Sequence, residues 1–248
     1  MTNYDWIFAI IIPIASYLIG SIPFSFIVAK WKSGEDLRET GNKNIGGLNT
    51  MMSAGFNWGI FAGWLDFMKG LVCLIFAMIF PFIVPSIQDP LFGAGKYYST
   101  NWHMLIFILT AMAVILGHNY SIYLKFQGGR GMAALVGFLI ILNPLLLLIF
   151  TICMMIIGGI TKYVRPSQFI ALLIGIPIAF FLNIYPPWIT NTNLNSTFVQ
   201  GMFIIGIGIV LFPKYLQSFI DMFRGKEYKV GKTGGVILAE DQEIEDKE

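Results

Sequence analysis

Residues 7–29 read IFAIIIPIASYLIGSIPFSFIVA, an uncharged stretch that is long enough to cross a lipid bilayer as a helix. Similar apolar runs recur at 58–84, 102–116, 131–142, 145–160, 167–184 and 197–212. Asn143 and Pro144 divide two of these runs, because proline inside a helix removes a backbone hydrogen bond. The pattern predicts an all-α, polytopic membrane protein with about seven transmembrane helices.

The composition of the whole chain agrees with this prediction. Hydrophobic residues make up 56% of the chain and charged residues 12%, whereas about a quarter of a soluble domain is charged. A surface with so few charges needs lipid as its solvent. The net charge of +2 is too small to indicate a nucleic-acid partner, and both cysteines lie in apolar runs, which indicates buried thiols.

The basic residues predict an orientation in the membrane. With the N-terminus outside, 14 of the 16 lysines and arginines fall in the inner segments 30–57, 117–130, 161–166 and 213–248. We therefore expect an N-out, C-in protein in the cell membrane, with these segments on the cytoplasmic face. Residues 1–230 are predicted to form one transmembrane domain, and the acidic residues 231–248 a disordered cytoplasmic tail.

The first inner segment contains a loop rich in glycine and asparagine. Residues 34–49 read GEDLRETGNKNIGGLN. Glycine and asparagine adopt positive φ angles readily, and such loops can turn several backbone N–H groups toward one anion. The loop predicts an anion site, with an ordinary connecting loop as the alternative.

The second inner segment carries three glycines around one arginine, Gly128-Gly129-Arg130-Gly131, directly before a predicted helix. Free N–H groups at a helix start and a guanidinium group both bind phosphate. The alternative is a tight interfacial turn whose arginine reaches toward lipid headgroups. His118 precedes this turn and is the better placed of the two histidines for a site.

The last inner segment, from 213 to 227, fits a basic juxtamembrane helix on anionic lipid.

Asp66 and Lys69 are charged residues inside a predicted span. Their spacing of three places them on one helix face, where they form either a functional pair or a structural ion pair.

The two histidines are predicted on opposite sides of the membrane, and neither a metal-ligand spacing nor a Ser-His-Asp set can be assembled. We therefore predict no metal and no cofactor.

Taken in order, these segments resemble the acyl-phosphate-dependent glycerol-3-phosphate acyltransferases of bacteria. The resemblance covers most of the chain, from about Ile7 to Glu227. It rests on Gly20-Ser21-Ile22-Pro23, Lys30, Gly34, Asp36-Leu37-Arg38, Gly41, Asn44-Ile45-Gly46, Asn49, the stretch Leu65–Gly70, Gly117-His118, the turn from Phe126 to Gly131, and more weakly Gly225-Lys226-Glu227.

The resemblance implies a seven-helix enzyme of phospholipid biosynthesis that moves an acyl chain from acyl-phosphate to glycerol 3-phosphate and gives lysophosphatidate. Its substrates and the membrane lipids would be its partners. We expect Arg130 and His118 to serve catalysis. The donor phosphate would lie on Gly128, Gly129, Arg130 and Gly131, the acceptor near Arg38, Lys43, Asn44, Gly46 and Asn49, and Asp66, Lys69 and Ser21 would support the site.

The chain departs from the family pattern at four positions that bear on the acceptor. Asn42 stands where the family has serine, Met52 where it has arginine, Tyr215 where it has histidine and Ser218 where it has asparagine. The alternative function is therefore an altered or inactive relative of the enzyme, acting as a membrane protein that binds phospholipid or another anion, or as a small transporter.

Overall fold

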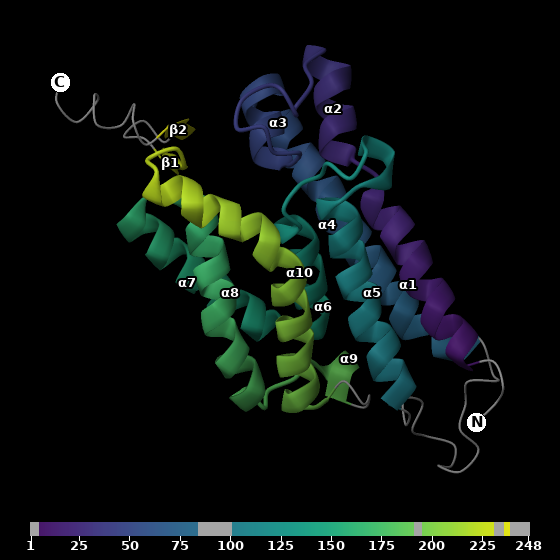
Figure 1. Cartoon of the computed structure of the whole chain (residues 1–248). Helices are drawn as coiled ribbons and strands as arrows, with labels where there is room; N and C mark the ends of the chain where they lie inside the picture. The colour runs from purple at the N-terminus through teal and green to yellow at the C-terminus, as the bar shows by residue number, and fades with distance from the viewer. Residues whose placement is uncertain (1–4, 84–100, 191–194, 231–235, 239–248) are drawn as a thin grey trace, which may run out of the picture.

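The protein is a bundle of helices with one small hairpin at its C-terminal end (Figure 1). The computed structural model describes residues 5–83, 101–190, 195–230 and 236–238. The elements are α1 (Asp5–Ser21), α2 (Phe24–Ser33), α3 (Gly47–Ala54), α4 (Phe56–Ile83), α5 (Asn101–Asn119), the 3₁₀ helix η3 (Ile122–Leu124), α6 (Met132–Leu142), α7 (Pro144–Thr161), α8 (Val164–Phe181), α9 (Pro187–Thr190), α10 (Thr197–Phe223), β1 (Tyr228–Val230) and β2 (Val236–Leu238). The all-α membrane class is confirmed.

Six segments of the described chain are long and apolar enough to cross a membrane, the first of them running through α1 and α2. The remaining predicted span, 131–142, is the shorter helix α6. Its 11 residues extend about 16 Å, roughly half of a bilayer core. The lipid-facing surface is strongly apolar. On α7, for example, Met155 and Ile160 are 66% and 78% exposed, which only a lipid environment makes favourable.

The first predicted span is broken, whereas the sequence predicted one uninterrupted helix over 7–29. Helix α1 ends at Ser21 and α2 begins at Phe24, because Pro23 has no N–H to donate and disfavours helical geometry at Ile22. The break frees carbonyl groups for other partners. Lys69 Nζ donates to the Ile22 oxygen at 3.1 Å, and the Ser121 hydroxyl donates to the Ser21 oxygen.

The predicted break at Asn143 and Pro144 is confirmed. Helix α6 ends at Leu142, and α7 begins at Pro144. The Asn143 side-chain oxygen accepts from the N–H groups of Leu145 and Leu146, while its amide nitrogen donates to Gln200 and to the Ile184 carbonyl. Asn143 therefore caps α7 and ties this junction to α10.

Glycine allows α1 and α5 to pack backbone against backbone. A Cβ at Gly20 would overlap the Val114 carbonyl oxygen, and a Cβ at Gly117 would overlap that of Tyr17. Small residues permit such approach between membrane helices. Elsewhere the core is filled by aromatic side chains, with Phe203 of α10 lying 5.4 Å from Phe107, centroid to centroid.

Helix α10 contains Pro213 and bends, so that its C-terminal part turns over the ends of α7 and α8 (Figure 1). The chain continues into β1, which pairs in antiparallel fashion with β2. Residues 236–238 thus form a strand within the segment that was predicted as a disordered tail, because β1 offers backbone partners. The rest of that tail lies outside the described residues.

The orientation can be tested by cysteine labelling in a background in which Cys73 and Cys153 are replaced by alanine. Lys162 and Thr190 are both exposed, in loops predicted to lie on opposite sides of the membrane. We expect Thr190→Cys in intact cells to react with a membrane-impermeant maleimide, and Lys162→Cys to react only after permeabilisation. The reverse pattern would invert the predicted orientation.

Candidate functional site

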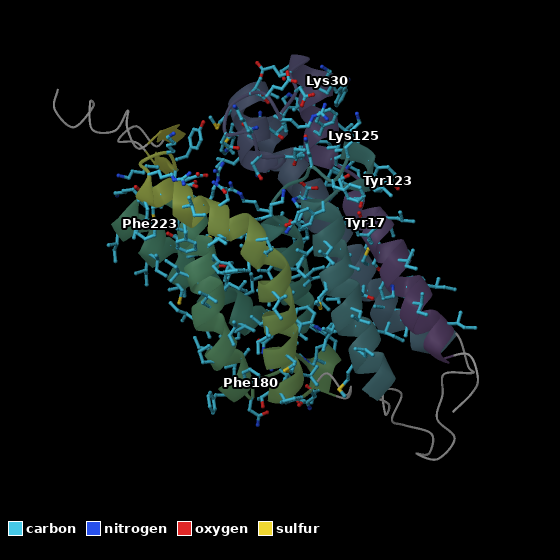
Figure 2. All side chains as sticks on the ribbon, viewed as in Figure 1. Tyr17, Lys30, Tyr123, Lys125, Phe180 and Phe223 are labelled. Carbon is cyan, nitrogen blue, oxygen red and sulfur yellow. The ribbon has the colours of Figure 1, made fainter. Side chains whose placement is uncertain are left out.

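A cleft lies at the polar end of the bundle. Figure 2 shows that side chains with nitrogen and oxygen gather near α2, α3 and β1, where Lys30 and Lys125 lie, whereas carbon dominates along the helices below. The cleft holds about 570 Å³ of empty space, including its open mouth. Among its lining residues are Asn42, Asn44, Gly46, Asp66, His118, Arg130, Gly131, Arg165, Gln168 and Tyr215.

The glycine turn before α6 forms one wall of the site, and its geometry differs from a simple nest of positive φ angles. Of its three glycines, only Gly131 has a positive φ, of 72°. Gly128 and Gly129 are needed for close approach: a Cβ at Gly129 would overlap His118 Nε2 and the Ile45 carbonyl oxygen. The Gly129 N–H donates to the His118 carbonyl oxygen at 2.9 Å, so this amide is already occupied.

Arg130 lies in the cleft and carries an unsatisfied donor. Its Nη1 atom is buried and has no hydrogen-bond partner within the described ranges. Burial lowers the pKa of Arg130 to about 10, so the guanidinium stays charged at neutral pH. A buried, charged group with a free N–H favours binding of an anion.

A buried charge cluster lies beneath the turn. Asp66 Oδ1 is 2.9 Å from Lys69 Nζ, which confirms that these residues pair, and Ser25 donates a 2.6 Å hydrogen bond to Asp66 Oδ2. His118 Nδ1 lies 3.6 Å from Asp66 Oδ1. Ser21 lines a smaller neighbouring cavity with these residues, and its hydroxyl has no partner in the part of the chain that the structure describes. The imidazole of His118 lies beside this cluster and lines the cleft.

The first loop contributes to the cleft through Asn42, Asn44 and Gly46. Asn49 does not line the cleft and instead holds the loop together: its oxygen accepts from the Asn42 N–H, and its amide donates to the carbonyls of Leu37 and Thr40. Asn42 Nδ2 lies 3.9 Å from Met52 Sδ. Two of the four departures from the family pattern therefore contact each other.

Arg38 and Lys43, the predicted charges of the acceptor region, are not among the residues that line the cleft. Arg38 forms an ion pair with Asp36 and holds the pKa of that carboxyl to about 2, so the pair stays charged at neutral pH. Lys43 is exposed, with a positive φ of 53°. In this conformation the structure gives Arg38 a local partner and leaves Lys43 in solvent.

Three polar side chains enter the cleft that the sequence did not single out as site residues. Arg165 and Gln168 come from the first turns of α8, and Tyr215 from α10. The Tyr215 hydroxyl donates to Gln168 Oε1 at 2.9 Å, and its ring stacks on Phe169. In the sequence, Arg165 served only as one of the basic residues that predict the orientation. No local pattern links it to the glycine turn at Arg130, 35 positions earlier in the chain. Ser218 is buried, and its hydroxyl has no partner among the described residues.

The C-terminal hairpin closes one side of this region. Arg165 Nη1 lies 3.1 Å from Glu227 Oε1, and burial raises the pKa of Glu227. The hydroxyl of Tyr228 donates to the Gly41 carbonyl oxygen at 3.1 Å. The segment at the start of the hairpin therefore links α8 to the first loop.

An integral membrane bundle with a cationic cleft at its polar end is the class of protein that the fold and site define. A sequence profile described as "Glycerol-3-phosphate acyltransferase" matches residues 10–225. The chain belongs to this family, which confirms the predicted resemblance and the membrane acyltransferase reading over its alternatives.

Individual relatives carry the same description. The chain is 32% identical to a glycerol-3-phosphate acyltransferase of Phytoplasma australiense, covering 86% of this chain and 91% of that one. It is 28% identical to glycerol-3-phosphate acyltransferase 2 of Thermotoga maritima, covering 91% and 96%. A crystal structure of PlsY (YgiH), an integral membrane glycerol 3-phosphate acyltransferase in its glycerol 3-phosphate form, superposes with a TM-score of 0.69 at 25% identity, covering 91% of this chain and 96% of that one.

The Asp66–Lys69 pair makes a prediction for stability. Asp66→Asn or Lys69→Met alone leaves a buried charge without its partner, and we expect each to lower the free energy of unfolding by about 3–5 kcal/mol. The double variant should lose clearly less than the sum of the two. Thermal unfolding of the purified proteins measures this, and strictly additive losses would show that the two charges do not depend on each other.

The glycine turn makes a second prediction. Gly129→Ala places a Cβ against His118 Nε2 and the Ile45 backbone, so we expect a lower melting temperature and a displaced turn. Gly159→Ala on α7 is the matched control, because its Cβ would meet nothing within 4 Å. Equal melting temperatures for the two variants would contradict the close packing of the turn.

Proposed function

We propose that the cleft transfers an acyl chain from acyl-phosphate to the 1-hydroxyl of glycerol 3-phosphate, on the cytoplasmic face of the cell membrane. The observation that carries the proposal is Arg130, a half-buried arginine whose buried Nη1 has no hydrogen-bond partner among the described residues, in an open cleft at the polar end of a membrane bundle. Family membership supports glycerol 3-phosphate as the acceptor. The position of the cleft beside lipid-facing helices suits a donor with an acyl tail.

The chemistry needs positioning more than a protein nucleophile. The acceptor hydroxyl attacks the carbonyl carbon of the acyl-phosphate, and the bond between that carbon and the phosphate oxygen breaks. The products are lysophosphatidate and phosphate, and the hydroxyl proton ends on the phosphate. Arg130 would stabilise the charge that collects on the leaving phosphate.

His118 is the residue best placed to help move the proton. Its imidazole borders the cleft between Asp66 and Gly129, and Asp66 fixes its orientation. An oriented imidazole can accept the hydroxyl proton during attack and return it to the departing phosphate. No metal or cofactor is required by this scheme.

The direct test is purified protein incubated with palmitoyl phosphate and glycerol 3-phosphate, with lysophosphatidate and phosphate both measured. We expect equal amounts of the two products, and no product when palmitoyl-CoA replaces the acyl-phosphate. Saturable binding of glycerol 3-phosphate without turnover would instead favour the anion-binding alternative.

Arg130 gives the sharpest mutational prediction. Arg130→Ala removes a charge-assisted contact worth roughly 1.5–3 kcal/mol, so we expect kcat/KM for acyl-phosphate to fall by about ten- to hundredfold. Arg130→Lys should recover part of the loss, since lysine keeps the charge but loses the bidentate geometry. Arg224→Ala, at an exposed arginine, is the control. Unchanged kinetics in Arg130→Ala would exclude Arg130 from donor binding.

A further inference from the structure

Arg165 is a buried arginine whose structural contacts do not use all of its hydrogen-bond donors. It is the second residue of α8, is 7% exposed and lines the cleft. Its Nη1 pairs with Glu227, and the ring of Tyr228 lies 5.4 Å from its guanidinium carbon. Its Nη2 is buried and finds no hydrogen-bond partner among the residues that the structure describes. One edge of the guanidinium is thus held, and the other has a free donor.

The same cleft holds a second incompletely satisfied guanidinium, that of Arg130. Buried N–H donors on charged groups are costly to leave unpaired, so two of them in one cleft indicate a missing acceptor. Among the described residues, Glu227 is the carboxylate paired with Arg165, but neither of its buried oxygens makes a hydrogen bond. One carboxylate cannot satisfy two guanidinium groups, and Asp66 is engaged by Lys69 and Ser25.

The charge balance indicates what kind of acceptor is missing. Among the described residues, the two guanidinium groups and the nearby Lys214 face the carboxylates of Glu227 and Asp221, so positive charge is in excess. The start of α8 adds to this, because its N-terminal N–H groups have no side-chain cap and its dipole is positive at that end. A compact dianion with several acceptor oxygens fits this set of donors, and guanidinium groups match phosphate geometry well.

We propose that Arg165 is a phosphate ligand of the cleft, binding a terminal phosphate dianion together with Arg130 while Glu227 holds the other edge of its guanidinium. The proposal deepens the proposed function, on which it rests for the identity of the substrates. Glycerol 3-phosphate is a phosphate monoester and acyl-phosphate is a mixed anhydride, but both carry a terminal phosphate dianion, and the two sources are separated by experiment.

The test uses the full chain in lipid nanodiscs and the double variant Arg165→Met/Glu227→Gln. Changing both partners removes the ion pair without leaving a lone buried charge, so the fold should survive. Inorganic phosphate and glycerol 3-phosphate are titrated by calorimetry, and the KM for palmitoyl phosphate is measured separately. Arg224→Met, an exposed arginine at the end of α10, is the matched control.

We expect the double variant to bind inorganic phosphate about ten- to hundredfold more weakly, the loss of one charge-assisted contact, and the control to bind as the wild type does. A matching loss for glycerol 3-phosphate assigns Arg165 to the acceptor phosphate, and a rise in KM for palmitoyl phosphate alone assigns it to the donor. Unchanged values in both arms, with the variant folded, would overturn the proposal.

A second variant keeps the test decisive if the double variant does not fold. Arg165→Lys retains the charge beside Glu227 but has no second guanidinium edge for an anion, so phosphate affinity should fall several-fold while the melting temperature stays close to that of the wild type. Equal phosphate affinity in this variant would also overturn the proposal. Because phosphate binding needs no turnover, a wild type that binds phosphate through Arg165 but transfers no acyl chain would sink the proposed function and leave this inference standing.

Discussion

The buried ion pair of Asp66 and Lys69 is the interaction on which the rest of the site depends. Two charges that are each about 2% exposed in a membrane helix require nearly complete satisfaction, and the protein draws the partners from separate segments. Ser25 of α2 and the Ile22 carbonyl at the α1–α2 break supply them, and His118 at the end of α5 lies beside the carboxylate. The need to satisfy these charges fixes three helix ends around one point.

Close backbone packing connects the buried ion pair to the glycine turn at the cleft. The turn at Gly128 and Gly129 lies directly against His118 because no Cβ intervenes, and the Gly129 N–H is bonded to the His118 carbonyl. The imidazole is thereby confined between the buried charges and the turn. Arg130 follows in the chain and is presented to the cleft from a support that has little freedom to move.

The positive charge of the cleft comes from helices that are far apart in sequence. The family pattern has arginine at the position of Met52, where this chain has no charge, and Arg38 is engaged by Asp36. Arg165 brings a guanidinium into the cleft from α8. Glu227 and Tyr228 of the C-terminal segment hold that arginine and tie the hairpin to the first loop.

The sequence by itself determined the features that depend on local geometry or on composition. Apolar runs and scarce charge gave the membrane bundle, Asn143-Pro144 gave the start of α7, and a spacing of three placed Asp66 beside Lys69. The break at Pro23 is also local, since proline itself causes it, although the sequence prediction missed it. The tertiary structure alone decided the convergence of Arg165 with Arg130 and the exclusion of Lys43 from the cleft. These outcomes depend on how whole helices cross and which backbone groups they leave unpaired, and no local spacing in the chain encodes the distance between the start of α8 and the turn before α6.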